Sequence, residues 1–218
     1  MSGYEVSHLD ELEQLPVDDE GLVWRPIRRR FGIAAFGTNA YSAARAGDRV
    51  VESHTERMNE HEEMYVVVTG RARFTLGDEE LDAPAGTLVF IRDPGVRRGA
   101  TAVEDGTTVL AVGARPGYAF EPSAWEDSFV AGAYGRLGRI DEGLAIMRAA
   151  VERHPDAWQG YYNLACLESL AGRRDEALAS LERAYELEPE DVARIAADDA
   201  ELDAIRDDPR FPSAHSTA

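Results

Sequence analysis

Cysteine is nearly absent from this sequence, and long hydrophobic runs are absent altogether. The single cysteine, Cys166, excludes an intrachain disulfide and a metal cluster built from several thiolates. No segment approaches the roughly twenty consecutive apolar residues that a transmembrane helix needs. The N-terminal stretch MSGYEVSHLDELEQL also lacks the basic and apolar regions of a signal peptide. We therefore expect a cytoplasmic protein that does not insert into membranes.

Positive charge is scarce, and none of it comes from lysine. The chain has 23 arginines against 41 acidic residues, which gives a net charge of -18. A nucleic-acid-binding protein presents a basic face, and this balance argues against one. Anionic membranes are unfavourable partners for the same reason. We expect neither a nucleic-acid partner nor a membrane partner.

What the sequence does contain is enough apolar material for two compact domains. The chain has 218 residues, of which 44% are hydrophobic and 29% are charged. One small module would be shorter, and two domains of ordinary size fit this length. A boundary between two differently patterned halves is therefore expected.

The first half has the pattern of short strands. From Leu22 to about Gly117, β-branched and aromatic runs alternate with turn residues, and no helical period intervenes. The clearest runs are residues 64–68, 71–76, 87–91 and 107–112. Short strands without crossover helices favour an antiparallel barrel or sandwich over a parallel sheet.

After Ala119 the chain changes to helix-forming residues and contains an internal repeat. Residues 139–155 align with residues 173–189 at a period of 34, with a glycine before each segment and a proline at the end of each. Each unit is predicted to be a helical hairpin. The first helices are expected at about 125–137 and 157–171, the second helices within the aligned segments, and a capping helix at about 191–205.

Four parts follow from this reading. They are an acidic N-terminal segment at 1–20, a β-barrel at 21–117, a helical unit at 118–210 and a tail at 211–218. In the N-terminal segment, Leu9, Leu12 and Leu15 make one apolar stripe. A short docking helix and a frayed tail both fit this pattern.

The helical repeat resembles the tetratricopeptide repeat family over nearly all of residues 122–190. In the second unit the positions at which that family places its packing residues are filled by Tyr161, Leu164, Gly172, Ala177, Leu181, Ala184 and Pro189. The first unit departs from the family at Gly143, where alanine is usual, and at Asp127, where a large apolar residue is usual. The resemblance implies stacked helical hairpins that stabilise the chain or bind a protein partner.

The first half resembles the cupin family, whose members are small β-barrels. The first cupin motif is a glycine, then His-x-His, then a glutamate, then six residues and a glycine. Glu63, the run MYVVVT and Gly70 match the last part of this motif. His54 stands at the first histidine position, while Glu56 replaces the second histidine.

The second cupin motif is also altered. Gly86 and the run TLVFI fit it, but the segment RDPG at 92–95 is one residue longer than usual. Arg98 occupies the position at which the family has a histidine. The fold that the resemblance implies is an antiparallel cupin-like barrel followed by tetratricopeptide-like hairpins, with a changed set of site residues.

A metal site is one interpretation of these residues. Side chains two positions apart on a strand share a face, so His54 points with Glu56, and His61 points with Glu63. If Glu63 faces the barrel interior, as the resemblance implies, two imidazoles and two carboxylates converge. This mixed nitrogen and oxygen set suits a divalent first-row ion such as Mn, Fe, Ni or Zn.

Arg98 supports an interpretation without a metal. Its permanent charge would lie where the family has its fourth ligand, and it opposes a nearby divalent cation unless a carboxylate lies between them. The guanidinium would then replace the metal by pairing with Glu63 or Glu56. Alternatively it anchors a carboxylate ligand beside a metal, with the Tyr65 hydroxyl turned toward the same ligand. Both outcomes stay open, and Arg98 and Tyr65 are the candidate ligand-binding residues.

Three functions are compatible with these features. The first is a small-molecule-binding cupin-like protein with a helical module. The second is a metal-dependent cupin enzyme, an oxygenase or isomerase acting on a small organic acid, with Arg98 holding the carboxylate and Tyr65 or Glu56 moving protons. The third is a protein-interaction scaffold. Ligand identity does not follow from the fold, because cupin barrels host unrelated chemistries.

Assembly is a separate expectation. A barrel with free edge strands exposes unpaired backbone, and two repeats are few for a solenoid that stands alone. Pairing across a two-fold axis hides both kinds of surface, so we expect a homodimer.

Overall fold

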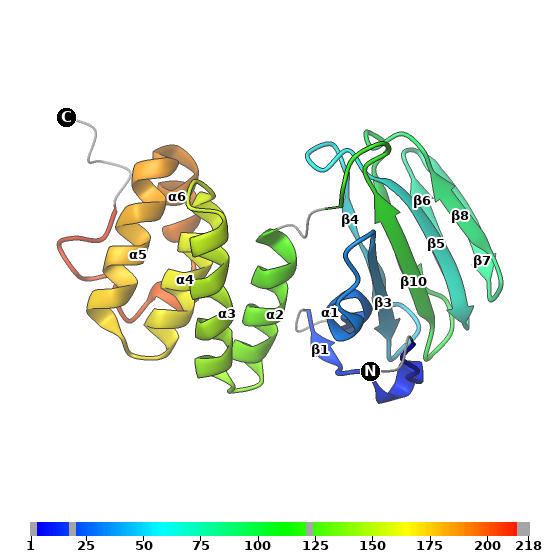
Figure 1. The fold of residues 1–218 in the computed structure, drawn as a ribbon, viewed down its shortest axis with the longest axis horizontal. Helices are drawn as coiled ribbons and strands as arrows, with labels where there is room; N and C mark the ends of the chain where they lie inside the picture. Colours follow the sequence, from blue (N-terminus) through cyan, green and yellow to red (C-terminus); the bar gives the residue numbers. More distant parts are fainter. Residues whose placement is uncertain (1–3, 18–20, 121–123, 213–218) are drawn as a thin grey trace. The chain divides into compact units, whose positions relative to one another are not determined.

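The chain divides into two compact units, residues 1–122 and 123–218. The structure is a computed structural model, and it describes residues 4–17, 21–120 and 124–212. Figure 1 shows that the first unit is built from strands and the second from helices. Most of the predicted tail at 211–218 lies outside the described residues.

The strands of the first unit form two antiparallel sheets. They are β1 (Leu15–Pro16), β2 (Leu22–Arg25), β3 (Gly37–Ala43), β4 (Arg49–His54), β5 (Glu62–Thr69), β6 (Arg71–Leu76), β7 (Glu79–Pro84), β8 (Leu88–Ile91), β9 (Arg98–Ala102) and β10 (Thr108–Ala114). The larger sheet has the order β1-β2-β3-β10-β5-β8, and the smaller sheet has the order β4-β9-β6-β7. The predicted antiparallel strands are confirmed.

A closed barrel, by contrast, is not observed. Among the described residues no hydrogen-bonded strand pair joins the two sheets. The chain passes from one sheet to the other at every connection from β3 to β6 and again at every connection from β7 to β10. Turns and side-chain packing therefore hold the sheets together. The fold is therefore a two-sheet sandwich, because the edge strands meet by packing rather than by backbone pairing.

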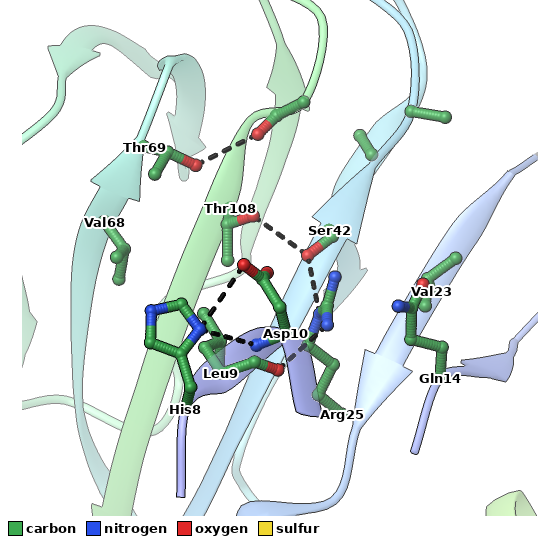
Figure 2. Close-up of a pocket in the computed structure, with 13 residues that line it drawn as sticks. His8, Leu9, Asp10, Gln14, Val23, Arg25, Ser42, Val68, Thr69 and Thr108 are labelled. Carbon is green, nitrogen blue, oxygen red and sulfur yellow. Dashed lines mark hydrogen bonds and ion pairs between the residues drawn. The ribbon is translucent and has the colours of Figure 1, made fainter. Parts of the chain in front are cut away.

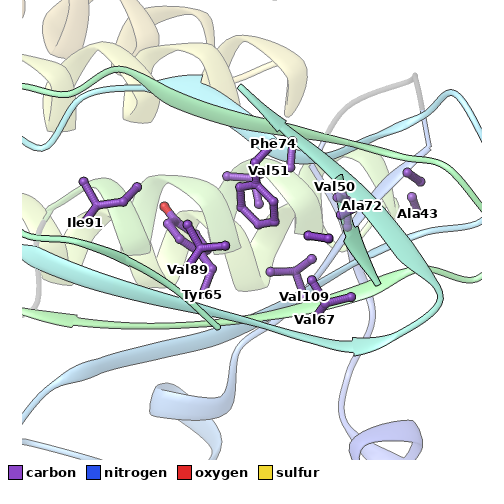
Figure 3. Packing of buried hydrophobic residues seen from close by; sticks show 13 residues of the cluster. Ala43, Val50, Val51, Tyr65, Val67, Ala72, Phe74, Val89, Ile91 and Val109 are labelled. Atoms are coloured by element: carbon purple, nitrogen blue, oxygen red, sulfur yellow. The ribbon is translucent and has the colours of Figure 1, made fainter. Parts of the chain in front are cut away.

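Alternating side chains from both sheets fill one core (Figure 3). Tyr65 and Val67 enter it from β5, Phe74 from β6, and Val109 from β10. The rings of Tyr65 and Phe74 come from different sheets, and their centroids lie 5.7 Å apart. Each such buried side chain contributes about 1.5–3 kcal/mol. This core fixes the positions of β4, β5 and β9, on which the candidate site lies.

Two short helices cover the sheet sandwich near the N-terminus. The 3-10 helix η1 (Leu9–Glu11) begins at His8 with a capping box closed by Glu11, and Arg25 donates a 3.0 Å hydrogen bond to the Leu9 carbonyl. The docking alternative for this segment is thus the one observed. The helix α1 (Ile27–Phe31) was not expected, and the reading of 22–117 as free of helix is wrong there. A helix of 5 residues is too short to show a helical period.

The helical unit contains the four repeat helices that the sequence predicted. They are α2 (Ala124–Arg136), α3 (Ile140–Arg153), α4 (Trp158–Leu170) and α5 (Arg174–Leu187). The glycines between the paired helices, Gly138 and Gly172, are both left-handed, with φ of 73° and 72°. No helix among the described residues has the length and hydrophobicity to cross a bilayer.

The predicted capping helix at 191–205 is in fact two shorter elements. The helix α6 (Pro189–Ala196) starts at the proline that follows α5, and the 3-10 helix η2 (Ala200–Leu202) comes after it. Asp199 caps η2 through the Glu201 amide, and Arg206 donates to the Ala196 carbonyl at the end of α6. These polar contacts satisfy the backbone where one long helix was expected.

The structure explains both departures of the first repeat from the tetratricopeptide pattern. A Cβ atom on Gly143 would lie 2.8 Å from the carbonyl oxygen of Ala131, so α2 and α3 approach too closely for alanine. Asp127 is buried and accepts a 2.7 Å hydrogen bond from Arg153. An ion pair thus replaces the apolar contact that this position usually makes.

The close approach at Gly143 predicts a change in stability. Gly143→Ala is expected to lower the free energy of unfolding by about 1–2 kcal/mol, because overpacking destabilises the helix pair by more than the higher helix propensity of alanine stabilises it. Gly132→Ala in α2 is the matched control, since its added Cβ meets nothing closer than the Arg136 guanidinium at 3.5 Å. That control should raise stability by up to about 1 kcal/mol. Urea unfolding followed by circular dichroism measures both, and equal effects would contradict the packing argument.

Candidate metal site

The predicted site residues gather where β4, β5 and β9 begin or end. His54 is the last residue of β4, and its Cα pairs with that of Arg98, the first residue of β9. Glu63 lies at the start of β5. Glu56 and His61 lie in the turn between β4 and β5. Sheet register therefore brings together residues from two separate sequence motifs.

The His54 ring is oriented by a backbone hydrogen bond. Its Nδ1 lies 2.8 Å from the carbonyl oxygen of Glu52. A carbonyl only accepts, so Nδ1 carries the hydrogen in the neutral ring and the lone pair is on Nε2. That Nε2 lies 3.5 Å from Glu56 Oε1 and 3.6 Å from Glu63 Oε2. The lone pair of Nε2 faces two carboxylates, so this position favours the binding of a proton or a metal cation.

Three of the four predicted metal ligands form one donor group. One ligand atom each from His54, Glu56 and Glu63 lies within 4.8 Å of the others. Two atoms bound to one first-row ion at about 2.1 Å are separated by roughly 3.0–3.5 Å, close to the two separations from His54 Nε2. The donor set and its spacing therefore fit a divalent ion.

His61 stands apart from this group. Its Nδ1 lies 3.5 Å from Glu56 Oε2, the oxygen that does not face His54. Its ring also lies near that of Phe120, with centroids 6.1 Å apart. The structure thus places His61 behind Glu56 rather than beside Glu63.

Tyr65 and Arg98 hold Glu63 from the inner side. The Tyr65 hydroxyl donates to Glu63 Oε2 at 2.8 Å, and Arg98 Nε lies 3.3 Å from the same oxygen. The exposed side-chain fraction falls from 34% at His54 to 12% at Glu63 and 0% at Arg98. A ligand that enters from solvent therefore meets Glu63 before Arg98 or Tyr65. Direct contact of these two residues with a ligand stays a prediction.

Arg98 is a buried charge with few partners. Within the described part of the chain its Nε and Nη2 atoms have no hydrogen bond, and its Nη1 reaches the Pro94 carbonyl only at 3.4 Å. Glu63 is the carboxylate that balances it. Because an unpaired buried guanidinium is costly, this pair keeps Glu63 ionised and directed inward.

The charges shift the pKa values of the site in opposite directions. Burial raises the pKa of Glu63, but hydrogen bonds from His54 and Tyr65 and the charges of His54 and Arg98 outweigh it, so the net pKa is lowered. Burial lowers the pKa of His54, but hydrogen bonds to Glu63 and to the Glu52 carbonyl, with the nearby carboxylates, raise it overall. The pair therefore favours an imidazolium beside a carboxylate when no other cation is present.

Sequence reasoning missed the turn that organises the altered motif. The Pro94 carbonyl accepts a 2.9 Å hydrogen bond from the Glu56 amide and also faces Arg98 Nη1. Pro94 lies in the segment that is one residue longer than the cupin pattern, and this extra length was the available signal. Gly113 was missed too: a Cβ there would lie 3.1 Å from Glu63 Cγ and displace the carboxylate.

A second group of donors lies in the helical unit. It comprises Cys166, Asp199 and Glu201. The Cys166 thiol donates to Asp199 at 3.7 Å, and burial, followed by the neighbouring carboxylates, raises the pKa of this thiol. The Tyr162 hydroxyl also donates to Asp199, at 2.7 Å. The protonated thiol is thus a hydrogen-bond donor within the packed helices.

Comparison with known proteins finds likeness in both units. Residues 159–191 match the family model of the tetratricopeptide repeat. A comparison with curated proteins found no match. Similar solved structures include an RmlC-like cupin protein from Desulfovibrio desulfuricans, which is 26% identical, with 51% of this chain and 97% of that chain covered and a TM-score of 0.41.

Two further cupin-like structures are more distant in sequence. KdgF from a Halomonas species is 18% identical, with 48% of this chain and 88% of that chain covered and a TM-score of 0.41. A sugar phosphate isomerase from a cupin superfamily of Silicibacter pomeroyi is 16% identical, with 54% and 83% covered and a TM-score of 0.44. The tetratricopeptide resemblance that the sequence predicted is confirmed at residues 159–191, and the similar solved structures are cupin-like proteins.

The opposed pKa shifts predict how pH acts on the metal-free protein. The pKa of His54 should lie above its ordinary value of 6.5 in a histidine NMR titration. Glu63→Gln should lower it, because the substitution removes the hydrogen-bonded charge, whereas Glu152→Gln on α3 should leave it unchanged. An unshifted His54 in the wild-type protein would contradict the geometry.

The same shifts set the pH range of greatest stability. The stabilisation from protonated His54 is complete below 6.5 and is lost as pH rises through its raised pKa. The stabilisation from ionised Glu63 is complete above 4.5 and is lost as pH falls through its lowered pKa. Both contributions are present together between pH 4.5 and 6.5. The melting temperature of metal-free protein should therefore be highest in that range.

The burial of Arg98 predicts a large loss of stability on truncation. Arg98→Ala leaves Glu63 without its countercharge and should lower the free energy of unfolding by about 3 kcal/mol or more. Arg92→Ala is the control, because Arg92 is exposed and its Nε lies 3.9 Å from Glu62. Its effect should stay within about 0.5 kcal/mol. Similar losses for both variants in urea unfolding would refute the role given to Arg98.

Proposed function

We propose that the first unit binds a small anionic molecule through a divalent first-row metal ion held by His54, Glu56 and Glu63. The observation that carries the proposal is the orientation of His54, whose Nε2 faces both carboxylates while its Nδ1 is held by the Glu52 carbonyl. The set of one nitrogen and two oxygen donors suits Mn, Fe, Ni or Zn. His61 lies close enough to Glu56 to support it from the other side.

Each remaining residue has a positioning role in this proposal. Tyr65 and Arg98 hold Glu63 through one oxygen, and the Pro94 carbonyl holds the backbone of Glu56. Such outer contacts orient metal ligands and keep them ionised. When bound, the ion supplies Lewis acidity and open coordination positions.

The count of charges indicates the class of ligand. Glu56 and Glu63 bring two negative charges and Arg98 brings one positive charge, so the group with neutral His54 has a net charge of -1. A divalent ion changes this to +1. The loaded site therefore attracts an anion such as a small carboxylate, whereas the metal-free site, in which the raised pKa of His54 favours its protonated form, has no net charge and lacks this attraction.

An enzyme with the same site is the second candidate. Its base would be Glu56, which accepts a 2.9 Å hydrogen bond from Asn59. Tyr65 is less suited to proton transfer with a substrate, because burial and Glu63 raise its pKa well above 10. An oxygenase or isomerase acting on a small organic acid is the form that this candidate takes. A scaffold role for the helical repeats is independent of both and draws on the tetratricopeptide match.

Metal titration tests the proposal directly. Metal-free protein titrated separately with Mn, Fe(II), Ni and Zn should take up one ion per chain. The affinity for the metal should fall as His54 gains its proton on acidification. Tyr65→Phe should weaken binding by roughly 10–100-fold, as loss of an outer partner does, and Glu63→Gln should weaken it further. Glu80→Gln on β7 removes the same charge at an exposed position and should have no effect. Failure of all four ions to bind at neutral pH would end the proposal.

The anion is tested separately on the loaded protein. Malonate and acetate should bind to metal-loaded protein in calorimetry and should give no signal with metal-free protein. Equal binding to both forms would assign the anion to Arg98 or another site rather than to the ion. If the protein binds the metal but the loaded protein binds neither malonate nor acetate, the metal site is retained and the proposed class of ligand is rejected.

A further inference from the structure

A cavity of about 550 Å³ lies between the larger sheet and the N-terminal segment, and it contains none of the metal-site residues. Val23 of β2, Ser42 of β3 and Thr108 of β10 line it, and cross-strand register places them in one row. Because the next residue of β10, Val109, points into the core, this row lies on the outer face. Residues 8–10 line the cavity as well. Its volume is within the range of small-molecule sites.

A buried positive charge lines this cavity. Arg25 is 8% exposed. Figure 2 shows that its Nε donates to Ser42 Oγ, at 3.2 Å, and that its Nη1 donates to the Leu9 carbonyl, at 3.0 Å. Both acceptors are neutral, and no carboxylate of the described residues forms an ion pair with Arg25. Because a buried guanidinium is costly without a countercharge, the cavity favours a ligand that brings one.

The two hydroxyl groups beside Arg25 provide a further donor. Ser42 Oγ and Thr108 Oγ1 lie 2.9 Å apart, and either can donate to the other. The pair has two hydroxyl hydrogens, and the bond between them uses one. The other hydroxyl hydrogen and the Nη2 hydrogens of Arg25 have no acceptor among the described residues. This excess of donors favours a ligand with acceptor oxygens.

An apolar cavity adjoins the polar one. It has a volume of about 310 Å³, and Leu9 and Val68 line both cavities. The rest of its lining is apolar apart from one serine and comprises Leu12, Ile27, Phe31, Ala40, Leu110 and Ser7. A ligand with its oxygens near Arg25 can therefore extend a hydrocarbon chain past Leu9 and Val68.

The surrounding charge limits the ligand to a single negative charge. Asp10 also lines the first cavity, with a side chain that is 79% exposed and an Oδ2 atom 3.4 Å from His8 Nδ1. This carboxylate and the net charge of -18 both oppose a multiply charged anion. A monocarboxylate has one charge and two acceptor oxygens that suit a guanidinium. Burial of its hydrocarbon chain adds affinity that does not depend on charge.

We propose that the two adjoining cavities bind a medium-chain monocarboxylate. The carboxylate accepts hydrogen bonds from Arg25 and from the hydroxyl pair of Ser42 and Thr108, and the chain lies between Leu9 and Val68. This site shares no residue with the metal site and needs no metal. Acetate has no chain to bury and malonate has a second charge, so both bind here much more weakly than octanoate.

A ligand series tests the class of molecule on full-length, metal-free protein. Octanoate should bind in calorimetry with one molecule per chain. From butanoate to octanoate the affinity should rise by about 3–4-fold per added methylene. 1-Octanol has the same chain without the charge and should bind about 10-fold more weakly or less. Absence of octanoate binding, no dependence on chain length, or equal affinity for 1-octanol would overturn the proposal.

Polar variants test the head-group contacts. Arg25→Gln should weaken octanoate binding by about 10-fold or more, and Thr108→Val should weaken it by about 3–10-fold. Thr108→Val leaves the bond from Arg25 to Leu9 in place, so it tests the site without removing that contact. Arg73→Gln on β6 removes the same charge at an exposed position and should have no effect. Equal losses in Arg25→Gln and Arg73→Gln would reject the role of Arg25.

A change of bulk tests where the chain lies. Val68→Trp should obstruct both cavities and reduce octanoate binding by about 10-fold or more. Leu88→Trp is the control, because Leu88 is 65% exposed on β8 and lines neither cavity. Unchanged circular dichroism in each variant separates lost binding from misfolding, and equal losses in the two tryptophan variants would place the chain elsewhere.

The metal site gives the last control. Octanoate should bind equally to metal-free wild-type protein and to Glu63→Gln, because Glu63 lies on the inward face of β5. Binding that requires added metal, or that is lost in Glu63→Gln, would assign octanoate to the metal site and reject the second site. Retained octanoate binding in a protein that takes up no metal would end the metal proposal alone.

Discussion

The buried ion pair between Arg98 and Glu63 is the constraint around which the site is arranged. A guanidinium with no exposed surface needs a carboxylate, and Glu63 supplies it at 3.3 Å. That requirement keeps Glu63 ionised, with help from the Tyr65 hydroxyl. The ionised carboxylate in turn draws a proton or a cation to His54 Nε2. One buried charge thereby determines the protonation of its neighbours.

The departures from the cupin motifs form a connected set. Arg98 replaces one expected histidine and Glu56 replaces another, while the segment at 92–95 gains a residue. The Pro94 carbonyl in that longer segment faces both replaced positions, through the Glu56 amide and Arg98 Nη1. The added carboxylate also offsets the added arginine. We interpret the three changes as one altered site, because the Pro94 carbonyl contacts both replaced residues and the charge of Glu56 offsets that of Arg98.

Elements marked by a pattern that repeats along the chain could be predicted from the sequence. Features set by local packing and by single turns could not. The period of 34 located the paired helices, since equivalent glycines end equivalent helices. Strand alternation and the cupin motif placed His54 near Glu63. The depth of Arg98 and the separation of His61 depend on side-chain packing and on a turn, for which a single sequence has no periodic signal. The same limit explains the unexpected α1 and the divided capping helix, both set by local polar contacts and short lengths.

The strand β5 separates two chemically different surfaces. Its inward residues, Glu63 and Tyr65, belong to the charged cluster, and its outward residues, Met64 and Val66, lie on an apolar face beside Phe90 and Leu88 of β8. A shift of register by one position would exchange these sets, placing carboxylates on the apolar face and methionine beside Arg98. The pairing of β5 with β10 and β8 therefore has a strong energetic preference for one register. The buried Arg98 and the apolar outer rows favour the same register from opposite sides of the sheet.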